Sequence, residues 1–159
     1  MNIFFVDRDP RLAAQALVDK HVGKMLIETC QLLSTAHWFN DTWTGDMCLP
    51  AYKNHPCARW VRHSPETYEW AFLHCVYLGE EFKYRYGHVH GSTRRIPALH
   101  QGIRGVAVGW QDPPLAMPKE YHDRDVVKAY RNYYSLGKAH LHRWTKRNPP
   151  EWIYGKESE

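Results

Sequence analysis

The sequence predicts an all-α fold: a single compact domain over residues 1–159, with about four to five helices joined by long irregular loops. Two helix-start signals support this, since Asp9-Pro10 and Ser64-Pro65 each place a capping side chain before a proline suited to the first helical turn. The segments 18–38, 65–86 and 125–146 have the spacing of apolar or aromatic residues that is typical of helices. A chain of 159 residues, 43% of them hydrophobic, is large enough to fold around one core.

The first residues lead into a short helix. Residues 2–6 form an apolar run, which is either a brief strand or a buried N-terminal arm. The helix that begins at Asp9-Pro10 contains Leu17 and either continues or breaks and restarts near Asp19.

The strongest helical signal covers residues 18–38, where two faces separate at about 100° per residue. The apolar face holds Val18, Val22, Met25, Leu32, Leu33 and Ala36. The polar face is a continuous stripe of Lys20, His21, Lys24, Glu28, Gln31 and Thr35. Small residues lie between the two faces and let another helix approach closely: Gly23, Cys30 and Ser34.

The middle of the chain contains a loop and two helices. Residues 40–50 form the loop, and a short helix is expected over 54–63. A long helix over 65–86 then ends at Gly87, a residue type common just after helices. Apolar residues surround most of this helix, so we expect it to be the central buried one.

The C-terminal part combines an irregular region with one more helix. Residues 88–118 are irregular, apart from one short helix near 97–101. Residues 125–146 are expected to form the last long helix, which carries a tyrosine cluster and a set of basic side chains.

Composition and charge limit the classes of function. The formal charge of +4 is compatible with a polyanionic partner, although many ordinary domains carry such a charge. Four cysteines without CxxC spacing favour reduced thiols in a cytosol. The N-terminus has neither a basic start nor a long apolar run, so no signal peptide or membrane segment is expected. These features predict a cytoplasmic protein, located in the host cytoplasm if it is viral.

The best-marked chemical feature is the polar stripe. His21, Lys24 and Glu28 stand at i, i+3 and i+7 and therefore share a helix face. A base, an amine and a carboxylate at such spacing suit imine formation at a sugar C1′, with the carboxylate stabilising the developing positive charge. The alternative is a solvated helix face with Lys24 and Glu28 as an i, i+4 ion pair. The catalytic candidates are His21, Lys24 and Glu28.

Several other positions are candidates for nucleic-acid contacts. Asn54, His55 and Arg59 can donate to phosphate oxygens at a helix N-terminus, and Trp60 is either a base-stacking ring or a core residue. The end of the long helix and the last helix add aromatic and basic groups. The nucleic-acid candidates are Lys20, Gln31, Asn54, His55, Arg59, Trp60, Arg85, His88, Lys128 and Arg131.

No cofactor and no metal are expected. His88 and His90 alone have the spacing of two metal ligands, but a third ligand is not close in the sequence.

The sequence contains the stretch Ala51-Tyr52-Lys53-Asn54-His55-Pro56 with Arg59-Trp60, followed by a long helix that ends in Arg85-Tyr86-Gly87. This pattern resembles the small all-helical pyrimidine-dimer DNA glycosylases of the endonuclease V type. The tail Arg147-Asn148-Pro149-Pro150-Glu151-Trp152 is similar to theirs. The segments Asp19-Lys20-His21, Lys24-Met25 and Ala116-Met117-Pro118 with Tyr121 are also similar to small phage proteins. The resemblance is concentrated in residues 1–90.

The resemblance implies binding of double-stranded DNA, flipping of a nucleotide, and glycosidic cleavage through a Schiff base with subsequent strand nicking. In that family the nucleophile is the α-amine exposed by removal of Met1 before a small threonine, whereas residue 2 here is the bulkier Asn2. Counting along the chain places Gly23-Lys24 where the family keeps its catalytic glutamate, and Glu28 lies one turn further on. Glu28 or Asp19 is then the substitute carboxylate, and the nucleophile is Lys24 or Lys20, the Met1 amine or neither.

The residues and the resemblance together leave three hypotheses. The first is a DNA glycosylase and AP lyase, or a related phage-type DNA base-modification enzyme, acting on a flipped pyrimidine nucleotide. The second is a non-catalytic nucleic-acid-binding phage accessory protein. The third is a metal hydrolase that uses histidines such as His21, His55, His88 or His90.

Overall fold

The helix starts predicted at Asp9-Pro10 and Ser64-Pro65 are confirmed. The Asp9 side chain accepts hydrogen bonds from the backbone N–H groups of Arg11 and Leu12 at the start of α1 (Pro10–Ala16). Ser64 and Thr67 form a capping box at the start of α4 (Pro65–Tyr86), and Gly87, with φ of 76°, ends that helix. The computed structural model describes residues 1–154, apart from the side chain of Tyr154. The last residues of the predicted domain, 155–159, lie outside the described part.

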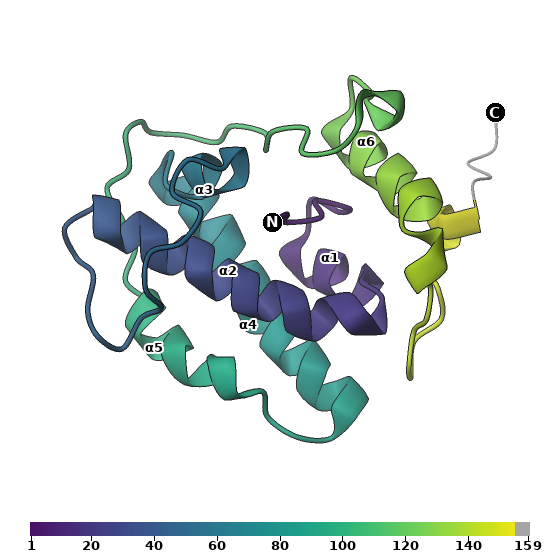
Figure 1. Cartoon of the computed structure of the whole chain (residues 1–159), viewed down its shortest axis with the longest axis horizontal. Coiled ribbons are helices and arrows are strands. Elements are labelled where there is room, and N and C mark those ends of the chain that lie inside the picture. Colours follow the sequence, from purple (N-terminus) through teal and green to yellow (C-terminus); the bar gives the residue numbers. More distant parts are fainter. Residues whose placement is uncertain (155–159) are drawn as a thin grey trace.

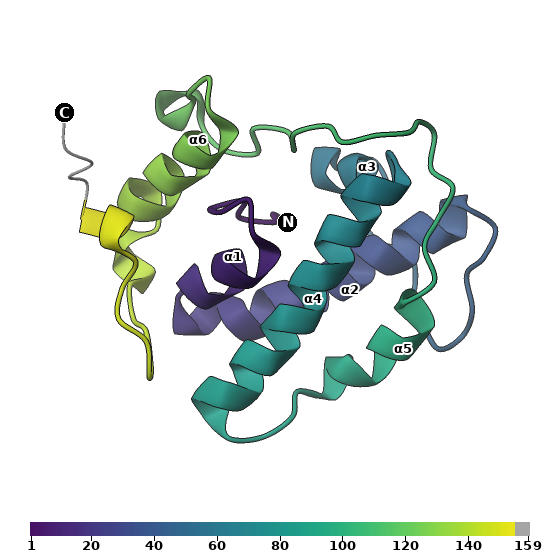
Figure 2. The same ribbon diagram turned by 180° about the vertical axis from the view of Figure 1, so that it is seen from behind.

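Residues 1–154 contain six α-helices and no β-strand, which confirms the all-α fold class. The long helices α2 (Asp19–Phe39) and α4 pack against each other, with α1 against α4 and α3 (Pro56–Val61) against α2 (Figures 1 and 2). The short α5 (Ile96–Leu99) and α6 (Val126–Asn132) complete the set. The chain breaks at Leu17 and Val18, which are extended, so the first two helices are separate.

Residues 2–6 form the buried arm that the sequence offered as one of two alternatives. The side-chain oxygen of Asn2 accepts hydrogen bonds from the backbone N–H groups of Ile3 and Phe4, at 2.7 and 2.8 Å. Its amide nitrogen donates to the backbone oxygen of Ala116 at 2.8 Å. The arm therefore lies inside the molecule, with the N-terminus near the centre of Figure 1, next to α2.

The prediction of one long helix over 125–146 was wrong. The α-helix stops at Asn132, and a π-helical turn over Tyr133–Gly137 and a 3-10 turn over Ala139–Leu141 come after it. The segment after these turns runs back across the N-terminal helices, where the Trp144 indole donates to the backbone oxygen of Ala16 at 2.8 Å. Such long-range hydrogen bonds override a helical pattern that was only local.

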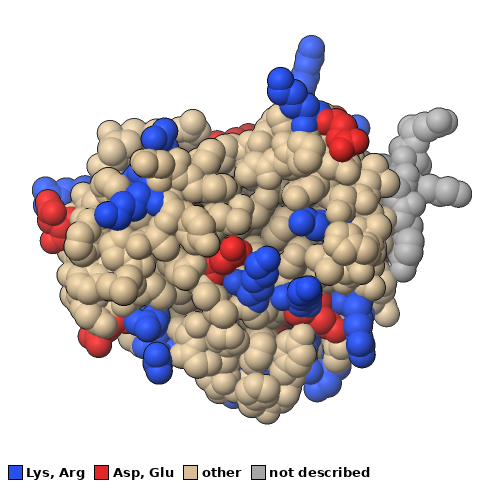
Figure 3. Space-filling view, in the orientation of Figure 1, with Lys and Arg blue, Asp and Glu red and all other residues tan. Residues whose placement is uncertain are grey.

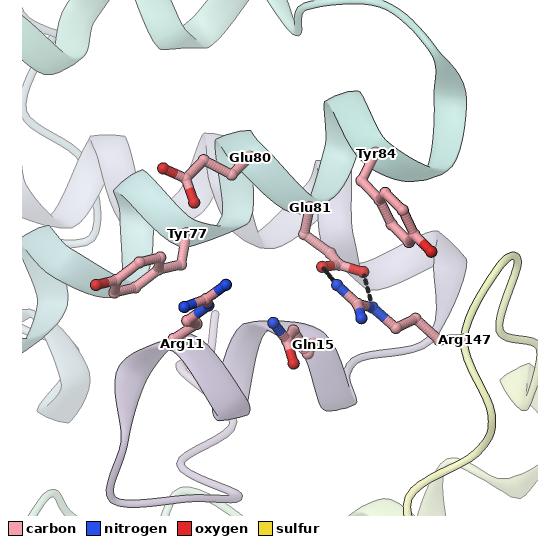
Figure 4. A pocket seen from close by; sticks show the side chains of 7 residues that line it. All are labelled: Arg11, Gln15, Tyr77, Glu80, Glu81, Tyr84 and Arg147. Carbon is pink, nitrogen blue, oxygen red and sulfur yellow. Dashed lines mark hydrogen bonds and ion pairs between the residues drawn. The ribbon is translucent and has the colours of Figure 1, made fainter.

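The predicted nucleic-acid contact of Arg85 was also wrong. Arg85 is 3% exposed, and its guanidinium donates to the Glu81 carboxylate at 2.9 Å and to the backbone oxygen of Leu17 at 2.6 Å. Arg147 donates to both carboxylate oxygens of Glu81, at 2.9 and 3.0 Å, at the edge of a hollow of about 180 Å³ between α1 and α4 (Figure 4). Burial alone raises the pKa of Glu81, but the hydrogen bonds from Arg147 and Arg85 hold it below its usual value. Arg85 therefore joins α4 to the α1–α2 turn.

A buried histidine links stability to pH. His74 stacks on Trp70 and contacts the backbone oxygen of Pro10 at 3.0 Å, and burial lowers its pKa from 6.5 to about 4. Between pH 6.5 and 4 the unfolded chain binds this proton and the folded chain does not, so the free energy of unfolding falls as the pH falls.

We expect His74→Leu to reduce the slope of unfolding free energy against pH in this interval by up to about 1.4 kcal/mol per pH unit. Urea titrations at several pH values measure this slope. The exposed His140→Leu variant controls for the loss of one imidazole. An unchanged slope in His74→Leu would show that the imidazole is charged inside the fold.

Candidate active site at the N-terminal amine

The polar stripe of α2 faces a pocket of about 160 Å³ that also contains the N-terminus of the chain. The three catalytic candidates, His21, Lys24 and Glu28, all line this pocket. The N-terminal arm, α2 and the C-terminal segment each contribute walls, and the lining residues are Met1, Asn2, Phe4, His21, Lys24, Met25, Glu28, Ala116, Tyr133 and Lys138. In the space-filling view, acidic groups lie near the middle of the face with basic groups close to them (Figure 3).

The closest ion pair in this pocket joins Glu28 to the α-amine of Met1, at 3.7 Å. The Met1 side chain is 1% exposed although the residue as a whole is half-buried, so its exposed surface belongs to the main chain that carries the amine. The second carboxylate oxygen of Glu28 is buried and has no hydrogen-bond partner among residues 1–154. The pocket thus holds an amine and a carboxylate that has spare hydrogen-bonding capacity.

The i, i+4 ion pair between Lys24 and Glu28, the solvated-face alternative, does not form in the described part of the chain. Lys24 is exposed, and Glu28 pairs instead with the N-terminal amine. Counting along the sequence had put Gly23-Lys24 at the position of the family's glutamate. The structure places the Glu28 carboxylate beside the amine, because the path of the arm decides which turn of α2 the N-terminus meets.

The surroundings of His21 differ from those expected for the base that the sequence suggested. Its ring stacks on the Phe4 ring, with 4.6 Å between the ring centroids, and its Nδ1 lies 2.9 Å from the Tyr134 hydroxyl oxygen. That hydroxyl accepts the Val18 N–H, so we assign its proton to the bond with Nδ1 and the imidazole proton to Nε2. Burial, together with the charges of Lys138 and Lys24, lowers the pKa of His21 to about 4. Near pH 7 His21 is therefore a neutral hydrogen-bond donor.

The predicted phosphate contacts at the start of α3 lie at the surface near the pocket. His55 caps α3 by accepting the Cys57 N–H at 3.0 Å. Burial and the positive charge of the N-terminal amine lower the pKa of His55. Asn54 and Arg59 are exposed beside it. Along α2, Lys20 is exposed and Gln31 is half-buried.

Trp60 is a core residue, so its predicted stacking on a base was wrong. It is 4% exposed, its indole N–H donates to the backbone oxygen of Gln111 at 2.8 Å, and its ring lies among those of Phe5, Trp70 and Trp110. The alternative of a capped helix with a core tryptophan is the one observed. Sequence spacing could not separate the two, because both place the ring on the same side of a short helix.

The remaining candidates lie away from the pocket lining. His88 and Lys128 are exposed, with Lys128 3.8 Å from Asp123. Arg131 is half-buried, donates to the backbone oxygen of Val6 at 2.9 Å and lies 3.6 Å from Asp7, so part of its hydrogen-bonding capacity is used inside the protein. No group of three His, Cys, Asp or Glu among residues 1–154 is arranged to hold a metal ion, so the metal-hydrolase hypothesis has no candidate site there.

Comparison with protein families agrees with this geometry. A model of the family described as pyrimidine dimer DNA glycosylase matches residues 1–94. The chain belongs to this family. The match covers the N-terminal arm and all of α2, and it supports a DNA glycosylase-type function in DNA repair with DNA as the substrate. No curated protein and no solved structure shows a significant match. None of the helices in residues 1–154 is long and apolar enough to span a membrane.

The pocket residues beyond position 94 were missed by sequence reasoning. Ala116, Tyr133 and Lys138 line the pocket but lie outside the matched region. They are more than 80 positions away from the α2 stripe, and no local pattern connects segments so distant. The pairing of Glu28 with the Met1 amine was one of the open alternatives, and only the path of the arm distinguishes it.

Proposed function

We propose that this protein is a DNA glycosylase with AP-lyase activity, which acts on a flipped pyrimidine nucleotide in double-stranded DNA through the α-amine of Met1. The observation that carries this proposal is the 3.7 Å contact between that amine and Glu28 inside a pocket lined by His21 and Lys24. An amine that attacks a sugar must give up its proton, and a carboxylate within reach accepts it.

The proposed chemistry has two stages. The nitrogen of Met1 bonds to C1′ while the bond from C1′ to the base breaks, and the base leaves with the electron pair and takes up a proton. The nitrogen releases a proton, and the bond from C1′ to the ring oxygen breaks as that oxygen takes up a proton, which leaves a protonated imine at C1′. Removal of a C2′ proton then expels the 3′ phosphate and nicks the strand. The Glu28 carboxylate stabilises positive charge at C1′ and accepts the protons that the nitrogen releases.

Asn2 supports Met1, and not residue 2, as the source of the amine. A side chain of this size hinders removal of the initiator methionine, and it is 8% exposed and hydrogen-bonded to Ala116, Ile3 and Phe4. Lys24 remains the other candidate nucleophile, but it is exposed and has no ion-pair partner among the described residues. The proposed contacts to the phosphate backbone are the exposed Lys20, Asn54 and Arg59 and the half-buried His55.

Borohydride trapping tests the function. Duplex oligonucleotides with a pyrimidine dimer, an abasic site or no lesion are incubated with the full chain and sodium borohydride, which reduces an imine to a stable amine. We expect a covalent adduct with abasic DNA, and with dimer DNA if that lesion is excised. Salt-sensitive DNA binding without an adduct on either lesion would contradict the proposal and favour the non-catalytic binder.

A further inference from the structure

We infer that the C-terminal π-helical turn, through Lys138 and Tyr133, forms a phosphate subsite at the mouth of the pocket. This inference rests on the proposed function only in taking DNA as the ligand. The subsite would bind the phosphate next to the nucleotide that reacts at Met1. Both residues lie outside the region that the family match covers, so the match assigns them no role.

The charges that line the pocket are unbalanced. Three positive groups line it, the Met1 amine, Lys24 and Lys138, against the single carboxylate of Glu28. Lys138 and His21 line the same pocket, and among the charged groups that lower the pKa of His21, Lys138 has the largest effect. The described part of the chain provides no ion-pair partner for Lys138, so the pocket has an excess of positive charge suited to an anion.

Lys138 directly follows the π-helical turn as its C-cap residue. A π turn adds one residue to a helix and therefore rotates the residues after the turn by about 100° relative to a regular α-helix. Gly137 allows the turn, since a Cβ at this position would lie 2.7 Å from the Tyr133 ring. The Tyr133 ring lies between the rings of Tyr121 and Phe4, whose centroids are 5.3 and 6.2 Å from its own. The Lys138 ammonium lies 5.1 Å from the Tyr133 ring centroid. Such turns occur frequently at functional sites.

The position of Lys138 and Tyr133 beside the Met1 amine indicates that the ligand of this subsite is a phosphate of the DNA backbone. A deoxyribose whose C1′ reaches the Met1 amine carries a phosphate on each side, and both phosphates must lie at the rim of a pocket of about 160 Å³. Lysine binds phosphate as a point charge, and the partly buried Lys138 is screened less by solvent than an exposed lysine is. Tyr133 is positioned to orient the ammonium through its ring face.

The test measures binding and not chemistry. Fluorescence anisotropy with a duplex that carries a tetrahydrofuran abasic analogue, which cannot form an imine, gives the dissociation constant at several salt concentrations. We expect Lys138→Gln to reduce the slope of log affinity against log salt by about one, and Lys138→Arg to restore it. Lys83→Gln, at an exposed lysine of α4, is the matched control and should keep the slope of the unchanged protein. Circular dichroism verifies that each variant is folded.

The outcomes separate this subsite from the catalytic proposal. An unchanged salt slope in folded Lys138→Gln overturns the subsite, even if the unchanged protein forms the borohydride adduct. A borohydride adduct attached to Lys138 itself also overturns it, since the side chain would then be a nucleophile. A reduced slope without any adduct in the unchanged protein supports the subsite and contradicts the lyase.

Discussion

Glu28→Gln is expected to lower the rate of strand cleavage at an abasic site by about 100- to 10,000-fold, the usual range for loss of a positioned acid–base group. The amide keeps the size of the side chain but can neither accept a proton from the Met1 amine, now 3.7 Å away, nor stabilise positive charge at C1′. Single-turnover cleavage of abasic duplex DNA, with the enzyme in excess, measures the chemical step separately from product release.

The control for this variant is Glu80→Gln. Glu80 is exposed on α4 and lines the hollow between α1 and α4, away from the N-terminal pocket. This change should leave the cleavage rate within about twofold, because surface substitutions outside special features have small effects. If Glu28→Gln stays folded and cleaves at the rate of Glu80→Gln, the Glu28 carboxylate has no part in the reaction.

Moving the free N-terminal amine by one residue is expected to lower adduct formation strongly. One added glycine before Met1 turns the Met1 nitrogen into an amide, which is not nucleophilic, and the free amine of the added glycine no longer has the position of the Met1 amine, 3.7 Å from Glu28. Mass spectrometry of the peptide trapped by borohydride should locate the adduct of the unmodified protein on Met1. Binding to the tetrahydrofuran duplex serves as a control, since the proposed DNA contacts of Asn54, His55 and Arg59 are unchanged in the extended protein.

A second variant distinguishes the two candidate amines. Lys24→Ala should still give an adduct on Met1, at a lower yield because one positive charge of the pocket is lost. Loss of the adduct in Lys24→Ala, together with normal trapping by the extended protein, would assign the nucleophile to Lys24 and overturn the role of Met1.

Local patterns in the sequence were enough to predict most of the helical fold. Asp9, Ser64 and Gly87 fix helix ends through their own side chains or backbone freedom, so the boundaries of α1 and α4 depend on neighbouring residues alone. The 3.6-residue period placed His21, Lys24 and Glu28 on one face of α2, and all three line one pocket. The catalytic roles of these three residues stay proposals until the variants are measured.

The sequence by itself determined which residues form helices and which side chains share a helix face, because these properties depend on residues within a few positions of one another. Only the tertiary structure decided what each face meets. It buried Trp60 and Arg85, broke the predicted last helix at a π turn, and brought the Met1 amine, Glu28 and Lys138 to one pocket. The physical reason is that such contacts join segments up to about 130 positions apart, through the packing and hydrogen bonds of the whole chain, such as that from Asn2 to Ala116.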